Sequence, residues 1–301
     1  MEDIVIVGGG PAGLTAAIYI ERAGKHAIVF EGASVGGQII TAANVVNYPG
    51  IKSISGADFA TELYEQALAL GAEVRFEKVV GVENKDAKHK VVKTANGSVD
   101  CKAVILATGA QNRKLGVEGE DRLLGKGVSY CATCDGNFFK GKEVAVVGGG
   151  NAALEDTKYL SNVCKKVYLI HRRNELRGNA GTAEELKAKP NVEFVLEANV
   201  TKLFGENKLE QIEVTKLDGS KIMLAVSGLF IAVGQVPGNG AFANLISLDN
   251  FGYVIAGEDC KTNIAGIFVA GDARTKMVRQ LTTAGADGST AALSAINYIR
   301  E

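Results

Sequence analysis

Short apolar runs separated by glycine-rich turns and amphipathic stretches form the main pattern of the chain. The first run, Ile4 to Val7, is rich in β-branched residues, which is typical of a strand buried in a parallel sheet. A glycine-rich turn, an amphipathic helix and another apolar strand follow it, and this unit covers residues 3–31. Residues 143–173 repeat the same order. The pattern therefore predicts two βαβ units and an α/β fold.

Both units carry the same kind of turn between strand and helix. The turns read Gly8-Gly9-Gly10-Pro11-Ala12-Gly13 and Gly148-Gly149-Gly150-Asn151-Ala152-Ala153, and both match G-x-G-x-x-G/A. The first glycine allows a tight turn, the second lets the backbone approach a pyrophosphate, and the third position keeps helix and strand close. Free N–H groups at the helix start would bind the phosphates. One match is a weak signal, but two in this context indicate two nucleotide sites.

The ends of the second strands distinguish the two sites. Glu31 and His171 stand at the same interval after Gly8 and Gly148. A carboxylate at this point accepts hydrogen bonds from ribose hydroxyls and repels a 2′-phosphate, so the first site is predicted to bind FAD. The second unit offers guanidinium groups, which suit a 2′-phosphate by charge and geometry and so predict NADPH: Arg172, Arg173 and Arg177. His171 is expected to pack beside the adenine without proton chemistry.

Three further apolar runs fit a nucleotide-binding domain that is split in sequence. Residues 103–109 form a predicted strand that ends in an Ala-Thr-Gly turn, and residues 228–234 are its counterpart in the second unit. Residues 266–272 deliver Asp272 to the carboxyl edge of the sheet, where it could accept hydrogen bonds from a ribitol chain. Residues 279–288 lead into a helix of small side chains, whose start could closely approach a flavin ring.

Composition and charge narrow the function classes. At 301 residues the chain has room for two domains and a sizeable core. Its net charge of −1 gives no broad attraction to nucleic acid or anionic membranes. No apolar run is long enough to span a membrane, and a strand starts almost at the first residue, so a cytoplasmic location is expected. In that compartment cysteines are thiols unless chemistry keeps them oxidised.

Cys131 and Cys134 form a C-x-x-C motif just before the second glycine turn. A zinc site would need a second such pair or two suitably spaced histidines, and neither exists, so we expect no metal. Two unreactive core cysteines are a second alternative. A redox disulfide agrees best with two nucleotide sites, because reduced flavin can pass an electron pair to a disulfide and free a thiolate for attack on another. Asp135 is the nearest candidate to protonate a leaving thiolate.

With these residues in place, the chain resembles the low-molecular-weight, bacterial-type thioredoxin reductases almost end to end. The matching motifs are GGGPAG, the turn Gly36-Gly37-Gln38 with Asn47-Tyr48-Pro49-Gly50, ATGA, CATCDG, GGGNAA, HRRNELR, AGDA and RQLTTAGADG. CATCDG is the most specific, because other disulfide reductase families carry their cysteines in the FAD half. The resemblance implies two Rossmann-like domains of the three-layer ββα type. The FAD domain comprises residues 1–113 and 238–301, with the NADPH domain, residues 114–237, inserted into it.

The resemblance also implies a homodimer and an electron route. NADPH reduces FAD, the flavin reduces Cys131–Cys134, and the dithiol reduces oxidised thioredoxin or a thioredoxin-like protein. Cys134 is expected next to flavin atom C4a, with Asp135 as the acid. The residues expected to contact FAD are Gly8, Gly10, Pro11, Ala12, Gly13, Glu31, Gly36, Gly37, Gln38, Asn47, Val79, Ala107, Thr108, Gly109, Gly271, Asp272, Arg279, Gln280, Leu281 and Ala284. Those for NADPH are Gly148, Gly150, Asn151, Ala152, His171, Arg172, Arg173 and Arg177.

Nicotinamide, disulfide and protein substrate cannot all reach their partners in one arrangement. The family rotates its NADPH domain, and the expected swivels here are residues 111–115 and 235–240. The second swivel departs from the family, which usually has Gly-His-x-Pro-Asn where this chain has Gly234-Gln235-Val236-Pro237-Gly238. Alternatives are a flavin oxidoreductase of the same fold with another donor or acceptor, and a flavin redox sensor without turnover. The intact nucleotide motifs argue against ferredoxin as donor, and the cysteine pair argues against a ferredoxin reductase.

Overall fold

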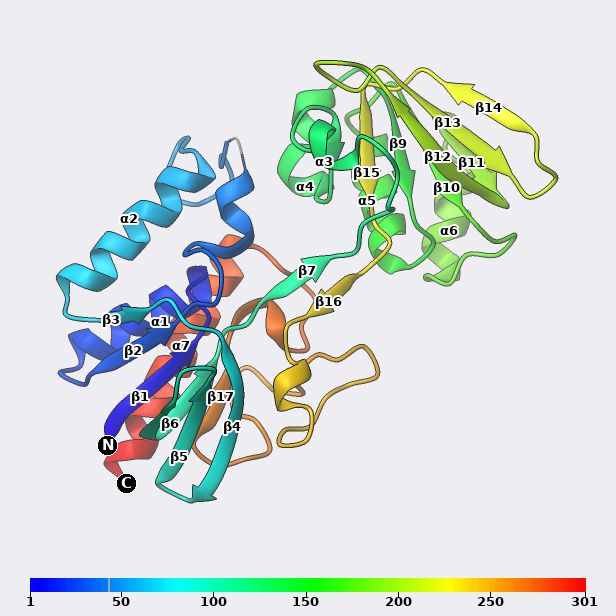
Figure 1. Cartoon of the computed structure of the whole chain (residues 1–301). Coiled ribbons are helices and arrows are strands. Elements are labelled where there is room, and N and C mark those ends of the chain that lie inside the picture. The colour runs from blue at the N-terminus through cyan, green and yellow to red at the C-terminus, as the bar shows by residue number, and fades with distance from the viewer. Residues whose placement is uncertain (43) are drawn as a thin grey trace. The chain divides into compact units, whose positions relative to one another are not determined.

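The computed structural model describes residues 1–42 and 44–301. They form two compact units: unit 1 comprises Met1–Gln111 and Val236–Glu301, and unit 2 comprises Asn112–Gln235. The chain leaves unit 1 along strand β7 (Ala110–Asn112) and returns along β16 (Gln235–Pro237), and these two strands pair with each other (Figure 1). Unit 2 is thus an insertion in the chain of unit 1, and both expected swivels begin in these connecting strands.

Unit 1 is built on a sheet of order β3-β2-β1-β6-β5-β4, with β17 paired to β6. The pairs of β1 with β2 and β6, of β2 with β3, and of β6 with β17 are parallel, whereas β4, β5 and β6 form an antiparallel meander. Its elements are β1 (Glu2–Val7), α1 (Pro11–Arg22), β2 (Ala27–Phe30), η1 (Gly37–Thr41), α2 (Gly56–Ala69), β3 (Glu73–Arg75), β4 (Val79–Asp86), β5 (His89–Thr94), β6 (Ser98–Leu106), η3 (Gly240–Phe242), β17 (Ile267–Val269), η4 (Gly271–Ala273) and α7 (Leu281–Arg300).

Unit 2 has a parallel sheet of order β11-β10-β9-β15-β8 and a separate antiparallel sheet of order β12-β13-β14. Its elements are α3 (Glu120–Leu123), β8 (Val128–Ser129), α4 (Ala132–Asp135), η2 (Gly136–Phe139), β9 (Glu143–Val147), α5 (Asn151–Ser161), β10 (Lys166–His171), α6 (Ala180–Lys187), β11 (Val192–Leu196), β12 (Ala198–Phe204), β13 (Gln211–Lys216), β14 (Lys221–Leu224) and β15 (Gly228–Ile231).

Each parallel sheet is covered on both faces, which explains the uninterrupted apolar runs. In β1, Ile4 and Ile6 pack with α1 and α7, while Val5 and Val7 pack against the meander. In β9, alternate residues likewise pack with α5 on one face and with β12, β13 and β14 on the other. The predicted fold class, two Rossmann-like three-layer units with one inserted into the other, is confirmed. In the described part of the chain, no helix is apolar enough over its length to cross a bilayer.

Helices α1 and α7 approach each other closely in unit 1. A Cβ added to Gly288 would lie 2.3 Å from the carbonyl oxygen of Ala12, so no larger residue fits there without moving a helix. Gly288 is itself buried, in the half of α7 that packs on the core. The small side chains of this helix therefore serve helix packing as well as the expected approach to a ligand.

Replacing Gly288 by alanine should lower the free energy of unfolding by about 1–3 kcal/mol, because the added Cβ must push α7 away from α1. Gly81→Ala is the matched control, since a Cβ at Gly81 has no neighbour within 4 Å. That control should change stability by less than about 0.5 kcal/mol. Urea unfolding followed by circular dichroism measures both variants, and equal effects would contradict the close approach.

Candidate functional site

The glycine-rich turn of unit 1 lies at the carboxyl edge of its parallel strands. Gly8 has φ +113°, and a Cβ there would lie 2.3 Å from the carbonyl oxygen of Ala107, the start of the Ala-Thr-Gly turn. A Cβ on Gly13 would lie 1.9 Å from the oxygen of Gly8, so helix and strand are as close as the motif requires. Gly10 faces open space and precedes α1, which has no side-chain cap. The first N–H groups of α1 are therefore available to an anion.

The Gly36-Gly37-Gln38 turn docks directly on this glycine-rich turn. The N–H of Gly36 donates to the oxygen of Gly9 at 2.8 Å, and Gln38 donates its side-chain amide to the carbonyl of Ala110, just beyond Gly109. Two more predicted residues meet nearby, because the Asn47 side chain donates to Gln280 Oε1 at 3.2 Å. These contacts join residues from five separate stretches of the sequence.

Glu31 occupies the end of β2 that the sequence predicted. Its carboxylate accepts the N–H of Gly9 at 2.8 Å and the N–H of Ala33 at 2.7 Å. These two bonds orient the side chain beside the glycine turn, and a carboxylate retains further lone pairs for ribose hydroxyls. Gly32 packs against Lys78, which brings the start of β4 at Val79 to the same corner. The Val79 side chain itself is buried in the core.

Asp272 is the most unusual polar group of unit 1. It follows β17 in the turn η4, and its Oδ1 is buried without a hydrogen-bond partner among the described residues. Burial raises the pKa of this carboxyl, and the nearby Lys276 and Arg279 oppose that shift. A buried acceptor without a donor is costly, and a ligand hydroxyl would satisfy it. Gly271, directly before it, leaves no room for a Cβ beside Ala12.

The remaining predicted residues of unit 1 lie at the start of α7. Gln280 caps the helix in a reciprocal capping box with Thr283, and Leu281 and Ala284 form the partly exposed first turn. The Arg279 guanidinium donates to the carbonyl oxygens of Asp272, Arg274 and Lys276 at 3.2–3.5 Å and lies 4.1 Å above the Tyr253 ring. Arg279 therefore shapes the loop that holds Asp272, a role that the sequence did not reveal.

Unit 2 repeats the turn geometry with different chemistry. A Cβ on Gly148 would lie 2.4 Å from the oxygen of Ala232, whereas Gly150 faces open space. Helix α5 starts at Asn151 and again has no side-chain cap, so its first N–H groups, around Ala152, can bind phosphate. The Asn151 side chain instead accepts the N–H of Asn179 at 2.7 Å.

His171 takes the place that Glu31 has in unit 1. Its ring lies so close to Gly149 that a Cβ there would be 2.2 Å from the ring. The side chain is buried, and its Nε2 has no partner among the described residues. Burial lowers the pKa of His171, and the positive charge of Arg177 lowers it further, so the ring is neutral at pH 7. This agrees with a packing role and offers one free polar atom to a ligand.

The three predicted arginines surround this turn. The N–H of Arg177 donates to the oxygen of Gly149 at 2.6 Å, which fixes the loop after β10 against the glycine turn. Arg172, Arg173 and Arg177 are exposed, and the structure shows no carboxylate paired with them in the part of the chain it describes. Uncompensated guanidinium groups beside this turn have a charge and geometry that suit a phosphate group.

Cys131 and Cys134 form a disulfide at the start of α4, with their Cα atoms 5.3 Å apart. Both residues are partly exposed. Cys131 is the N-cap, and its Sγ accepts the N–H of Cys134 at 3.2 Å. Sulfur at the start of a helix is favoured as a thiolate, because free N–H groups point at it. The pair therefore has the geometry of a redox centre.

Ser129 and Tyr130 are two residues that sequence analysis missed. Ser129 donates to Asp135 Oδ2 at 2.6 Å and accepts the N–H of Cys131 at 3.0 Å, so one hydroxyl ties the predicted acid to the disulfide segment. Tyr130 donates to the buried carboxylate of Glu120 at 2.5 Å. Burial raises the pKa of Tyr130, and Glu120 raises it further. Their position directly before the cysteines was the only available signal.

The structure explains why this chain has glycine at position 238, where the family usually has asparagine. A Cβ on Gly238 would lie 2.9 Å from the oxygen of Thr108, so the asparagine usual in the family does not fit there without a shift. The next residue, Asn239, is buried and accepts the Thr108 hydroxyl at 2.8 Å. It also donates to the carbonyls of Gly252 and Ala273. Asn239 thus holds the Ala-Thr-Gly turn in place.

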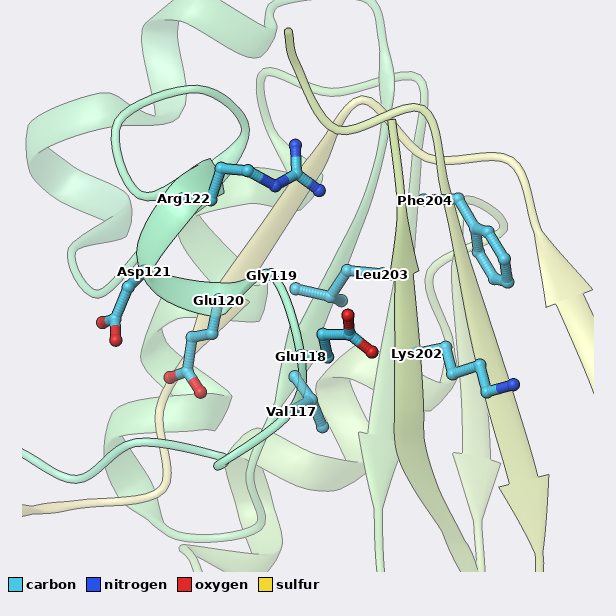
Figure 2. A pocket seen from close by; sticks show the side chains of 9 residues that line it. All are labelled: Val117, Glu118, Gly119, Glu120, Asp121, Arg122, Lys202, Leu203 and Phe204. Atoms are coloured by element: carbon cyan, nitrogen blue, oxygen red, sulfur yellow. The ribbon is translucent and has the colours of Figure 1, made fainter. Parts of the chain in front are cut away.

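A hollow of about 590 Å³ in unit 2 contains none of the residues predicted from sequence (Figure 2). It lies between the loop before α3 and strand β12, and its lining has mixed charge: Val117, Glu118, Gly119, Glu120, Asp121, Arg122, Lys202, Leu203 and Phe204. Within residues 1–42 and 44–301, no cluster of three histidine, cysteine or acidic side chains could hold a metal.

Comparison with known proteins agrees with this geometry. The pyridine nucleotide-disulphide oxidoreductase family matches residues 2–288. Thioredoxin reductase of Listeria monocytogenes is 40% identical over 99% of this chain and 94% of its own length, and that of Mycoplasma genitalium is 42% identical over 97% and 93%. The chain belongs to the thioredoxin reductases of this family.

Solved structures give the same result. Thioredoxin reductase from Streptococcus pyogenes is 37% identical, with a TM-score of 0.95 that covers 100% of this chain and 98% of the other. The family is one of flavoprotein oxidoreductases that act on disulfides, so the chain uses a flavin and a pyridine nucleotide. The predicted family and enzyme class are confirmed.

Thiol labelling tests the distinction between the two kinds of cysteine. Burial raises the pKa values of Cys101 and Cys260 to about 12 and that of Cys164 to about 11, so all three stay as unreactive thiols at pH 8. Native protein reduced with dithiothreitol should therefore take up iodoacetamide at Cys131 and Cys134 alone. Mass spectrometry with peptide mapping counts the adducts. Labelling of the buried thiols at a similar rate would contradict this assignment.

Proposed function

We propose that the chain is an NADPH-dependent reductase of thioredoxin or a thioredoxin-like protein, with FAD and the Cys131–Cys134 disulfide as successive electron carriers. The observation that carries the proposal is the partly exposed disulfide in the same unit as the second nucleotide turn. Relatives at about 40% identity over nearly the whole chain are named thioredoxin reductases, which supports the same substrate here.

The fit of FAD to unit 1 rests on features that share one edge of the sheet. The open face at Gly10 and the uncapped α1 suit a pyrophosphate, Glu31 suits ribose hydroxyls, and the unpartnered Oδ1 of Asp272 suits a ribitol hydroxyl. Bound FAD supplies the two-electron step between the nicotinamide and the disulfide. The protein's part is to hold these groups in place before the ligand arrives.

The fit of NADPH to unit 2 rests on the absence of an acid at His171 and on the three arginines around it. Glu31 in unit 1 would repel a 2′-phosphate, whereas Arg172, Arg173 and Arg177 attract one. The neutral, buried His171 offers a flat surface and one unpartnered nitrogen beside the turn.

The reaction of the cysteines is balanced as a two-electron exchange. Two electrons and two protons convert the Cys131–Cys134 disulfide to two thiols. One thiolate then attacks the thioredoxin disulfide and forms a mixed disulfide, and the second thiol resolves it. In this proposal Asp135, whose carboxylate accepts the Ser129 hydroxyl, protonates the leaving thiolate. The net change oxidises NADPH to NADP⁺ and reduces thioredoxin from disulfide to dithiol.

The proposal includes motion of the units about β7 and β16, because the same disulfide must accept electrons and meet a protein substrate. The Gln235 side chain donates to Asn112 Oδ1 at 2.9 Å, which links the two strands where the family usually has histidine. A homodimer and a cytoplasmic location complete the proposal, as in the family that the sequence resembles.

Turnover with oxidised thioredoxin tests the proposed function. The purified yellow protein should oxidise NADPH continuously when thioredoxin is present, and Cys134→Ser should abolish this while it still binds FAD. The Ser129→Ala variant provides the comparison, since it removes one hydroxyl beside Asp135 but leaves both sulfurs in place, and it should only slow the reaction. Flavin reduction that stops after one equivalent in the wild type would indicate a redox sensor instead.

Nucleotide preference tests the arginines. Replacing Arg172, Arg173 or Arg177 singly with glutamine should raise the KM for NADPH about 10- to 100-fold, because one charge-assisted bond to phosphate is worth about 1.5–3 kcal/mol. The KM for NADH should change less than about threefold, since NADH has no 2′-phosphate. Steady-state kinetics with both nucleotides measures the ratio, and equal loss with both would refute the 2′-phosphate site.

A further inference from the structure

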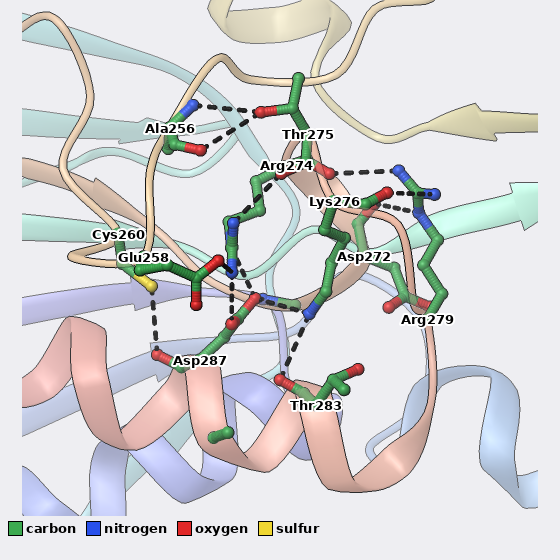
Figure 3. Close-up of polar contacts among 12 residues, drawn as sticks. Ala256, Glu258, Cys260, Asp272, Arg274, Thr275, Lys276, Arg279, Thr283 and Asp287 are labelled. Carbon is green, nitrogen blue, oxygen red and sulfur yellow. Dashed lines mark hydrogen bonds and ion pairs between the residues drawn. The ribbon is translucent and has the colours of Figure 1, made fainter.

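A cluster of buried charges lies directly beside Asp272 in unit 1 (Figure 3). At its centre is Asp287, in α7, with 6% of its surface exposed. Its Oδ2 accepts the N–H of Gly271 at 3.0 Å, Arg274 Nε at 2.8 Å and Lys276 Nζ at 2.8 Å. Its Oδ1 accepts Arg274 Nη2 at 2.8 Å. The carboxylate thus binds two cations and the backbone next to Asp272.

Both cations are as buried as the carboxylate. The side chains of Arg274 and Lys276 are 4% and 7% exposed. Burial alone would raise the pKa of Asp287, but the hydrogen bonds from Arg274 and Lys276 outweigh it and lower the pKa overall. Asp287 is therefore ionised, and removing its charge would leave two buried cations without a full partner.

Asp272 is the obvious alternative partner for these cations. It lies two residues before Arg274, and Lys276 is close enough to affect its pKa. Yet its Oδ1 is buried and has no hydrogen-bond partner in residues 1–42 and 44–301, although Lys276 and Arg279 lie nearby. Arg279 does not pair with it either, because that guanidinium is held by three backbone carbonyls and the Tyr253 ring. Each of the three cations instead has hydrogen bonds to other acceptors.

We propose that Asp287 is a positioning residue for the flavin site: it binds Arg274 and Lys276 and so keeps the oxygen of Asp272 free for the ligand. The bond to Gly271 also fixes the turn that presents Asp272. Without the charge of Asp287, Lys276 would pair with Asp272 and occupy the atom that accepts a ribitol hydroxyl. The inference rests on the proposed function, because it takes FAD as the ligand of unit 1.

The proposal is tested by measuring the affinity of the full chain for FAD. The purified protein is stripped of flavin and then titrated with FAD, and binding is followed by the quenching of FAD fluorescence. Asp287→Asn should raise the Kd at least about tenfold, the usual effect of losing a hydrogen bond to a charged group. Adding Lys276→Gln to that variant should bring the Kd back to within about threefold of the wild type, since it removes the competing cation. A role in packing alone predicts no such recovery.

Two single variants complete the design. Glu258→Gln removes a carboxylate that lies 3.8 Å from Arg274 but is 99% exposed. The Kd of this variant for FAD should therefore differ from that of the wild type by less than about twofold. Lys276→Gln alone should also retain affinity, and a loss as large as that of Asp287→Asn would overturn the proposal, because Lys276 would then bind the ligand itself.

The remaining outcomes are equally decisive. If Asp287→Asn binds FAD like the wild type, or if the double variant does not recover, the inference fails while the proposed function stands. If Asp287→Asn does not fold, a folded double variant that binds FAD supports the proposal, and an unfolded one overturns it. If the wild-type chain itself does not bind FAD, the proposed function fails.

Discussion

The structure depends on two places where backbone must touch backbone at the carboxyl edge of a parallel sheet. An added Cβ at Gly8 would lie 2.3 Å from the carbonyl oxygen of Ala107, and one at Gly148 would lie 2.4 Å from that of Ala232. Only glycine therefore fits at these two positions between strand and helix. Because these turns are so tight, α1 and α5 begin directly at the carboxyl edge of their sheets, and neither helix has a side-chain cap at its N-terminus. All the other groups of the two sites are arranged around these helix starts.

Much of this arrangement could be predicted from sequence, because it follows from local rules. Strand runs such as Ile4 to Val7 are apolar on both faces, and the glycine spacing locates each turn. The two nucleotide sites can be told apart from sequence, because the charges of Glu31 and of the arginines after His171 and their positions in the two units are enough to distinguish them. The cysteine pair is visible because its spacing and its isolation from other metal ligands exclude zinc. These features depend on near neighbours in sequence.

The contacts that sequence could not reveal are made by side chains whose partners no local pattern specifies. Asn239 holds Thr108, Ser129 holds Asp135, and Asp287 holds Gly271 and Arg274. The Arg279 guanidinium is bonded to the loop around Asp272, a contact that the sequence also does not reveal. In sequence, an acid among the small residues of α7 shows no partner, and only the fold brings it to two cations. Such supporting contacts fix the positions of the groups that the proposed function assigns to ligand binding.

The central claim is that electrons pass from NADPH through FAD to the Cys131–Cys134 disulfide. Anaerobic titration of the oxidised protein with NADPH, monitored by flavin absorbance and thiol content, tests it most directly. We expect the protein to take up about two equivalents, one for the flavin and one for the disulfide, with two new thiols at Cys131 and Cys134. Full flavin reduction after a single equivalent, with the disulfide intact, would contradict it.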